Sequence, residues 1–213
     1  MNDEIKTAFA AGRRRTYKRS EVIIGPTGPS DNVYLIESGY VKVSAINPKH
    51  HGHVLFFYGP GEVFPWRFLF DDETTIDFYD NTIKSALTDV VVIPMPIDEM
   101  RQRMKTDAAF TLELLHHQHK FYNRLILNLH INTSQQRVIY RLLVLADQFG
   151  RDMKDHTIID FPLTQQEFAD TVQLSRETTG KLLNELEANG NLIWGRKNIL
   201  VYTNRLKQLL VTD

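Results

Sequence analysis

The sequence has 213 residues, of which 42% are hydrophobic and 24% are charged, and it contains no cysteine. This composition excludes a disordered chain, and the absence of cysteine excludes a disulfide scaffold, a thiol nucleophile and thiolate-bound iron–sulfur or zinc centres. No apolar run approaches the ~20 residues that span a bilayer, and the start lacks the order of a secretory signal, so we expect a cytoplasmic protein. Basic and acidic residues balance, 15 against 16 up to residue 133 and 10 against 10 after it. A nucleic-acid-binding surface would therefore have to be a local basic face.

The first half of the chain has the pattern of a β-rich domain. Short runs of β-branched and aromatic residues alternate with turn-forming stretches such as GPTGPSDN and NPKHHGH, which predicts a β-sandwich or small barrel. Pro94 and Pro96 are expected to end the last strand, and Pro96 to start a short helix. The expected strands occupy residues 21–24, 33–36, 40–44, 54–58, 81–85 and 89–93.

A long helix is predicted from Thr106 to about Thr133, where the sequence has no glycine or proline. Apolar residues recur there at steps of three, four and seven and populate more than one helical face. Such a helix can pack both on its own domain and on a partner subunit, although a core helix of a monomeric domain would show the same pattern. The recurring apolar residues include Leu115, Tyr122, Leu125 and Leu129.

A further helix is expected from residue 134 to about residue 149, with Ser134 as its N-cap and Gly150 as its stop signal. A charged loop, RDMKDH, connects it to a short strand predicted at residues 157–161.

Two helices joined by a short turn come next. Thr164 and Glu167 fit a capping box that opens a short helix to about residue 171. Ser175 is the expected N-cap of a second helix over residues 176–188, which Asn189 and Gly190 end. This spacing predicts a helix-turn-helix.

The second of these helices begins with side chains suited to reading DNA. Arg176 can bond guanine, Glu177 can accept from cytosine, and Lys181 can reach a guanine or a phosphate. Ser175, Thr178 and Gln165 lie near the two helix N-termini, where hydroxyl and amide groups bond phosphates. The alternative is a solvated charged face at the start of an ordinary helix.

A hairpin is predicted directly after the second helix. Its strands are residues 192–194 and 199–202, and its turn carries Arg196 and Lys197. Two cations at the tip of such a wing suit phosphate contacts.

These motifs together resemble a known family. The segments SRETTGKLLNELE at residues 175–187 and LTQQEFA at 163–169 are similar to the DNA-recognition segment of the cyclic-AMP receptor protein/fumarate–nitrate regulator (CRP/FNR) family. VYLIESG at 33–39 and GPGEVF at 59–64 look like its double-stranded β-helix sensor domain.

The resemblance implies an α+β chain with three parts. These are a β-helix sensor domain of the cyclic-nucleotide-binding type over residues 1–106, a dimerisation helix over 107–133 and a winged helix-turn-helix over 134–213. It further implies a homodimer joined along the long helix, a palindromic DNA site, and RNA polymerase as a partner if the regulator activates. An enzyme is not expected.

The sequence departs from the family's cyclic-nucleotide members at their phosphate cassette. Pro65 and Trp66 stand at the Gly-Glu positions, and Asp80 and Asn81 fall at about the Arg-Ser positions. An aspartate there repels a phosphate, so cyclic AMP is not the expected effector, and no cofactor is assigned. Candidate residues of an effector pocket are Phe64, Trp66, Arg67, Asp80 and Asn81. The many aromatic residues nearby fit either an apolar ligand or a pocket filled by its own side chains.

Two rival functions remain open on the sequence alone. His50 with His53, or His116 with His119, could share a metal ion in a cupin-like metalloenzyme, although exposed or packing histidines are the expected outcome and no metal site is assigned. The winged domain could also bind another protein instead of DNA, which the near-neutral charge permits.

Overall fold

The computed structural model describes residues 3–26, 30–47, 50–66, 69, 82–127, 131 and 133–211. The chain divides into two units, Met1–Tyr122 and Asn123–Asp213. Among the described residues, no helix is both long enough and apolar enough to cross a membrane.

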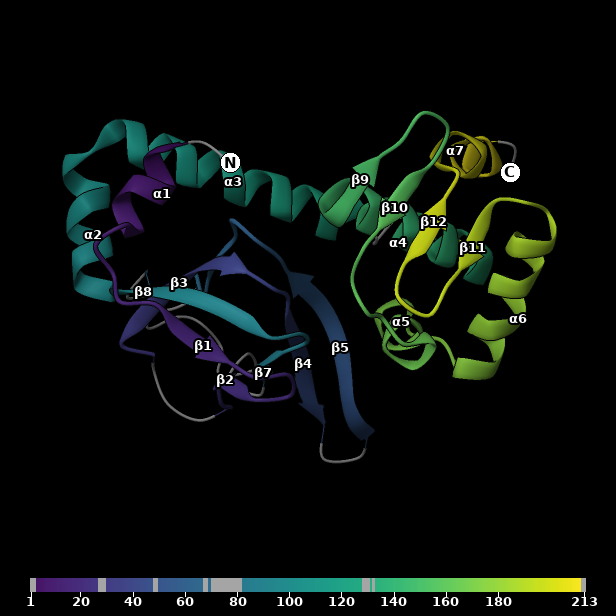
Figure 1. The fold of residues 1–213 in the computed structure, drawn as a ribbon, viewed down its shortest axis with the longest axis horizontal. Helices are drawn as coiled ribbons and strands as arrows, with labels where there is room; N and C mark the ends of the chain where they lie inside the picture. The colour runs from purple at the N-terminus through teal and green to yellow at the C-terminus, as the bar shows by residue number, and fades with distance from the viewer. Residues whose placement is uncertain are drawn as a thin grey trace. The chain divides into compact units, whose positions relative to one another are not determined.

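Two four-stranded antiparallel sheets form the first unit (Figure 1). The first sheet has the order β1-β8-β3-β6 and the second has the order β2-β7-β4-β5. The strands are β1 (Arg15–Tyr17), β2 (Val22–Ile24), β3 (Asn32–Ser38), β4 (Val41–Asn47), β5 (His50–Tyr58), β6 (Val63–Phe64), β7 (Thr82–Ala86) and β8 (Val90–Pro96).

Strand β3 explains how the first unit builds its core. Tyr34 and Ile36 face one cluster of buried residues, shared with the second sheet, whereas Val33 and Leu35 face another cluster, shared with the helices. Successive strand residues point to opposite faces, so a strand covered on both faces has a continuous apolar run. The run VYLI is therefore the sequence signature of this central position.

Three helices cover the outer face of the first sheet. α1 (Asp3–Phe9), α2 (Ile97–Thr106) and α3 (Ala108–Leu127) contribute Ile5, Phe9, Met100, Phe110 and Leu114 to the cluster that contains Val33 and Leu35. The acidic start of the chain is thus a helix, which we did not predict.

The helix predicted from Thr106 to Thr133 is wrong at both ends. Thr106 ends α2, and α3 starts after Asp107, whose carboxylate accepts a hydrogen bond from the Phe110 amide at 3.0 Å. α3 ends at Leu127, Ile131 lies outside any helix, and Thr133 caps the next helix.

Two other predictions for this unit are wrong. Strand β8 continues through Pro94 to Pro96, since it pairs with β1 only up to Val92 and the prolines need a partner only on the β3 side. His50 and His53 belong to strand β5 instead of the preceding turn. Among the described residues, no three potential metal-binding side chains gather in one place.

Exposed ion pairs lie on the surface of the first unit. Arg14 forms a bidentate pair with Glu37, with the shortest distance 2.7 Å, and Lys18 pairs with Asp89 at 2.8 Å. The hydrogen bonds from these cations lower the pKa of Glu37 and of Asp89.

The second unit is a sheet surrounded by helices. The sheet order is β11-β12-β10-β9, and all its pairs are antiparallel. The elements of the second unit are α4 (Ser134–Phe149), β9 (Gly150–Asp152), β10 (Thr157–Ile159), α5 (Gln165–Val172), α6 (Arg176–Ala188), β11 (Leu192–Trp194), β12 (Ile199–Val201) and α7 (Thr203–Val211). β9, which pairs with β10, occupies part of the segment that was expected to be a charged loop.

The N-cap of α4 is Thr133, so the assignment of Ser134 is wrong. The Thr133 hydroxyl accepts from the Gln136 amide at 3.1 Å, and the Gln136 side chain accepts from the Thr133 amide. Thr133 and Gln136 form a capping box, and this reciprocal pair satisfies two helix-end amides where Ser134 alone would satisfy one.

Gly39 lies in the tight turn between β3 and β4, which only a residue without a side chain fits. Its φ is +83°, and a methyl group there would clash with the Asp89 carbonyl oxygen. We expect Gly39→Ala to lower the free energy of unfolding by about 2–4 kcal/mol in urea titrations. Gly25→Ala is the matched control, because nothing lies within 4 Å of its added methyl group, and it should leave stability unchanged or slightly higher. Equal losses for both variants would contradict the steric argument.

Candidate DNA-binding interface

Both helices of the predicted helix-turn-helix begin at the predicted N-caps. The Thr164 hydroxyl accepts from the Glu167 amide at 3.1 Å, and the Glu167 carboxylate accepts from the Thr164 amide at 3.1 Å. The Ser175 hydroxyl accepts from the Thr178 amide at 3.1 Å. These local bonds fix where α5 and α6 start.

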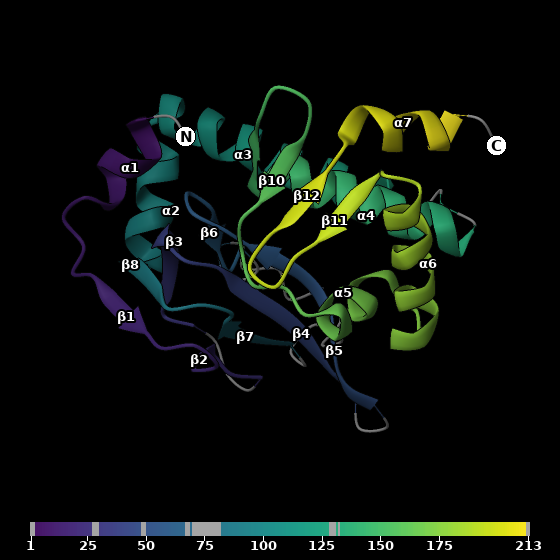
Figure 2. The same ribbon diagram turned by 45° about the vertical axis from the view of Figure 1, so that its right-hand side comes forward.

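An apolar contact holds α5 against α6 and the wing. Phe168, Ala169 and Val172 of α5 are buried, as are Leu183 and Leu186 of α6, whereas Leu182 is half-buried. The Phe168 ring also meets Trp194 of β11 edge to face at 5.3 Å. The helix-turn-helix and the hairpin therefore pack as one body, and Figure 2 shows β11 beside α6.

The C-terminal end of α5 is satisfied by four hydrogen bonds. The Leu174 amide donates to Ala169, and the Gln173 amide donates to Asp170, both at 3.1 Å. Two arginines of α4 bond the last two carbonyls: Arg141 donates to Thr171 at 3.0 Å, and Arg137 donates to Val172 at 3.3 Å. The last four carbonyls of a helix lack partners within it, so these bonds complete α5.

Arg141 carries this role from inside the unit. The residue is 7% exposed, and burial lowers its pKa to about 10. It therefore keeps its charge at neutral pH, where a cation at a helix C-terminus is favourable. Sequence reasoning missed this residue, although Arg137 and Arg141 stand four positions apart on one face of α4.

The predicted base-reading residues lie together at the open end of α6. Arg176, Glu177 and Lys181 are exposed, as are Ser175 and Thr178, whose hydroxyl oxygens are 2.8 Å apart. Gln165 is half-buried and lies against Gly180, with its side-chain oxygen 3.7 Å from where a methyl group on Gly180 would sit. The two helix N-termini thus share one surface.

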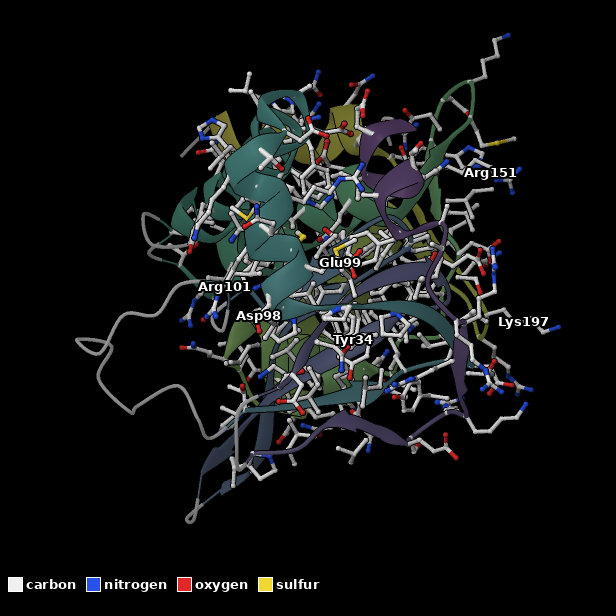
Figure 3. The ribbon with its side chains drawn as sticks, turned by 90° about the vertical axis from the view of Figure 1, so that its left-hand side faces the viewer. Tyr34, Asp98, Glu99, Arg101, Arg151 and Lys197 are labelled. Atoms are coloured by element: carbon white, nitrogen blue, oxygen red, sulfur yellow. The ribbon has the colours of Figure 1, made fainter. Side chains whose placement is uncertain are left out.

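The wing presents the two predicted cations. Its turn is closed by a bond from the Gly195 amide to the Asn198 carbonyl at 2.9 Å, which leaves Arg196 and Lys197 exposed at the tip. Figure 3 shows the Lys197 side chain extended away from the ribbon.

Two known domain families match the chain in the order that its architecture requires. A cyclic nucleotide-binding domain matches residues 14–107, and a Crp-like helix-turn-helix domain matches residues 136–209. The chain belongs to the CRP/FNR family. This is a family of transcription regulators and not of enzymes, as we predicted.

Several relatives of this CRP/FNR protein match over most of its length. A CRP-like cAMP-activated global transcriptional regulator of Mycobacterium tuberculosis is 26% identical over 188 residues, which cover 87% of this chain and 82% of the relative. A CRP/FNR-family regulator of Thermus thermophilus is 25% identical, with a TM-score of 0.67 and coverage of 92% and 97% of the two chains. FixK2 of Bradyrhizobium japonicum shares the fold, with 20% identity and a TM-score of 0.74. The match covers 93% of this chain and 97% of the FixK2 chain.

The side chains expected along a CRP/FNR dimer interface are only partly described. Leu115 and Tyr122 of α3 are 52% and 53% exposed. Leu112, which we did not assign to this interface, is 67% exposed. The Leu125 side chain and Leu129 lie outside the described part of the structure.

The expected effector residues divide in the same way. Phe64 is fully buried, and Trp66 is half-buried against the cluster that contains Met100 and Phe110. Arg67, Asp80 and Asn81 lie outside the described residues. Tyr34, which is labelled in Figure 3, stacks on Phe64 with ring centroids 5.6 Å apart.

An aromatic column runs from the sheets to α3. Phe64 also stacks on Tyr58 at 5.3 Å, and Tyr58 stacks on Phe121 of α3 at 5.6 Å. Burial is the main cause that raises the pKa of Tyr58. We call Tyr34, Phe64, Tyr58 and Phe121 the aromatic column.

Removal of Arg141 should destabilise the DNA-binding unit at the C-terminal end of α5. Arg141→Ala leaves the buried Thr171 carbonyl without its guanidinium partner, and we expect a loss of about 2–3 kcal/mol in the free energy of unfolding. Arg137→Ala, at a half-buried position with a longer bond, should cost about 1 kcal/mol. Thermal and urea unfolding measure both. An equal loss at the two positions would contradict the special role of Arg141.

Proposed function

We propose that this regulator acts in the cytoplasm as a homodimer that reads a palindromic DNA site through α6 and does not depend on a cyclic nucleotide. The observation that carries the proposal is the exposed set Arg176, Glu177 and Lys181 at the capped start of α6. This is the end of a recognition helix that enters the major groove.

The exposed side chains divide by the DNA groups that they suit. Arg176 bonds guanine at two acceptors, Glu177 accepts from cytosine, and Lys181 bonds guanine or a phosphate. The remaining residues contact phosphates and position the protein without reading sequence. They are Ser175, Thr178, Gln165, Arg196 and Lys197.

The exposed face of α3 supports the dimer. Leu112, Leu115, His119 and Tyr122 follow one another at steps of three, four and three, and all four are exposed. Residues spaced alternately by three and four positions form the contact seam of a two-helix coiled coil. The other face of α3 already packs on the first unit through Phe110, Leu114 and Phe121, so a second copy of α3 is the partner that this seam fits. A two-fold dimer binds half-sites about one helical turn apart.

The aromatic column supports independence from a cyclic nucleotide. Its four rings stack on one another and belong to or pack against one buried cluster between the second sheet and α3, so this space is occupied by the protein's own side chains. Pro65 and Trp66 also replace the Gly-Glu pair of nucleotide-binding relatives. The M. tuberculosis relative is named as cAMP-activated, and this chain departs from that mode of control.

Selection from randomised duplex DNA tests the proposal. Purified protein without ligand should enrich one palindrome at moderate salt, and cyclic AMP should change neither the sequence nor its affinity. Enrichment of a single half-site would contradict the dimer, and enrichment only with cyclic AMP would contradict the independent mode. Salt-sensitive retention with no enriched sequence would contradict sequence reading by α6.

Arg176 and Lys197 should separate base reading from phosphate contact. Arg176→Ala should cost about 1–3 kcal/mol on the selected site and relax the preference at one base pair. Lys197→Ala should weaken binding to all sequences alike and reduce the slope of log affinity against log salt concentration by about one. Affinity titrations on selected and random duplexes measure both. Equal loss on the two duplexes for Arg176→Ala would refute base reading.

Leu115 tests the α3 seam. Leu115→Glu places a carboxylate in the apolar seam, so we expect the mass in solution to fall from dimer to monomer and the affinity for the palindrome to fall with it. His116→Glu adds a carboxylate at the next exposed position, beside the seam, and should remain dimeric. Light scattering after size exclusion measures the mass. A wild-type monomer at micromolar concentration would refute the seam.

A further inference from the structure

The turn between α5 and α6 contains a strained residue. Gln173 has φ 55° and ψ 44°, the left-handed conformation. Among the described residues, Ser20, at φ 72°, is the other non-glycine residue with a positive φ. This conformation costs a side-chain-bearing residue about 1–2 kcal/mol, whereas glycine adopts it freely.

The fold requires the conformation but not the glutamine. The backbone amides of Gln173 and Leu174 close α5 by donating to Asp170 and Ala169, and a glycine would make the same bonds. Within the described part of the chain, the Gln173 carboxamide has no hydrogen-bond partner, and the side chain is exposed. Among the described residues, no contact of the Gln173 carboxamide therefore offsets the cost of a side chain at this position.

Gln173 lies next to the residues proposed to bind DNA. Leu174 alone separates it from Ser175, the N-cap of α6, and Arg176 follows. Figure 1 shows this turn at the end of α6 that adjoins α5. Residues with a side chain in this conformation cluster at functional sites. The carboxamide thus lies at the edge of the surface that carries the DNA-binding side chains.

We propose that the side-chain amide of Gln173 donates a hydrogen bond to a phosphate of the DNA backbone at the edge of each half-site. The inference rests on the proposed function, since it needs DNA on α6. A carboxamide offers two N–H donors and no charge, and phosphate oxygens are the most frequent acceptors in protein–DNA complexes. The contact positions the turn and therefore the start of α6.

Two variants at one position test the contact. Gln173→Gly removes the strain and the donor together, so the melting temperature should rise by about 2–5 °C. Affinity should meanwhile fall about three- to tenfold on selected and random duplexes alike. Gln173→Glu keeps the size and the strain but repels a phosphate, so its affinity should fall below that of Gln173→Gly, most strongly at low salt.

Ser20→Gly is the matched control, because it relieves a positive φ in the first unit. It should raise the melting temperature and leave DNA affinity unchanged. Unchanged affinity in both Gln173 variants would overturn the inference, and a loss confined to the selected site would replace the phosphate contact with a base contact. Wild-type protein that binds no duplex would refute the proposed function, and this inference with it, before any variant is made.

Discussion

Two arginine side chains of α4 satisfy the carbonyl end of α5, and only three residues separate that end from α6. Arg141 and Arg137 bond Thr171 and Val172, while the amides of the turn bond the two preceding carbonyls. With every terminal carbonyl occupied, α5 cannot unwind without exposing buried polar groups. α4 therefore fixes the C-terminal end of α5, and the short turn that follows limits where α6 can start.

The local features of the DNA-binding unit were readable in the sequence. Thr164 and Ser175 bond amides three residues away, and the wing pairs neighbouring segments, so short patterns contain all the information. Thr133 was also readable, since Gln136 completes its capping box. Arg141 was not, because its partner lies 30 residues away and the sequence pattern contains no sign of that contact. α7 was overlooked, although Leu206, Leu209 and Leu210 follow helical spacing.

The sensor-like unit was less predictable. Its longer strands follow from apolar runs, but β1 and β6 have three and two residues and exist only because neighbouring strands pair with them. Pro94 can stand in β8 because the pairing with β1 ends at Val92, which leaves the proline with a partner on the β3 side only. The arrangement of the sheets came from resemblance to a family, since hydrophobic alternation does not specify strand order. The aromatic residues were recognised, but their stacking into one column depends on tertiary contacts.

The choice of acceptors around Arg141 has a consequence for acid tolerance. A carboxyl group whose pKa is lowered in the folded state stabilises the fold above its unfolded pKa, and that contribution disappears as the pH falls through the folded value. Glu37 and Asp89 in the first unit are of this kind. Backbone carbonyls do not titrate, so the bonds from Arg141 and Arg137 keep their strength in acid. Acidification therefore weakens ion pairs on the sensor-like unit while the helix-turn-helix keeps the arginine bonds at the end of α5.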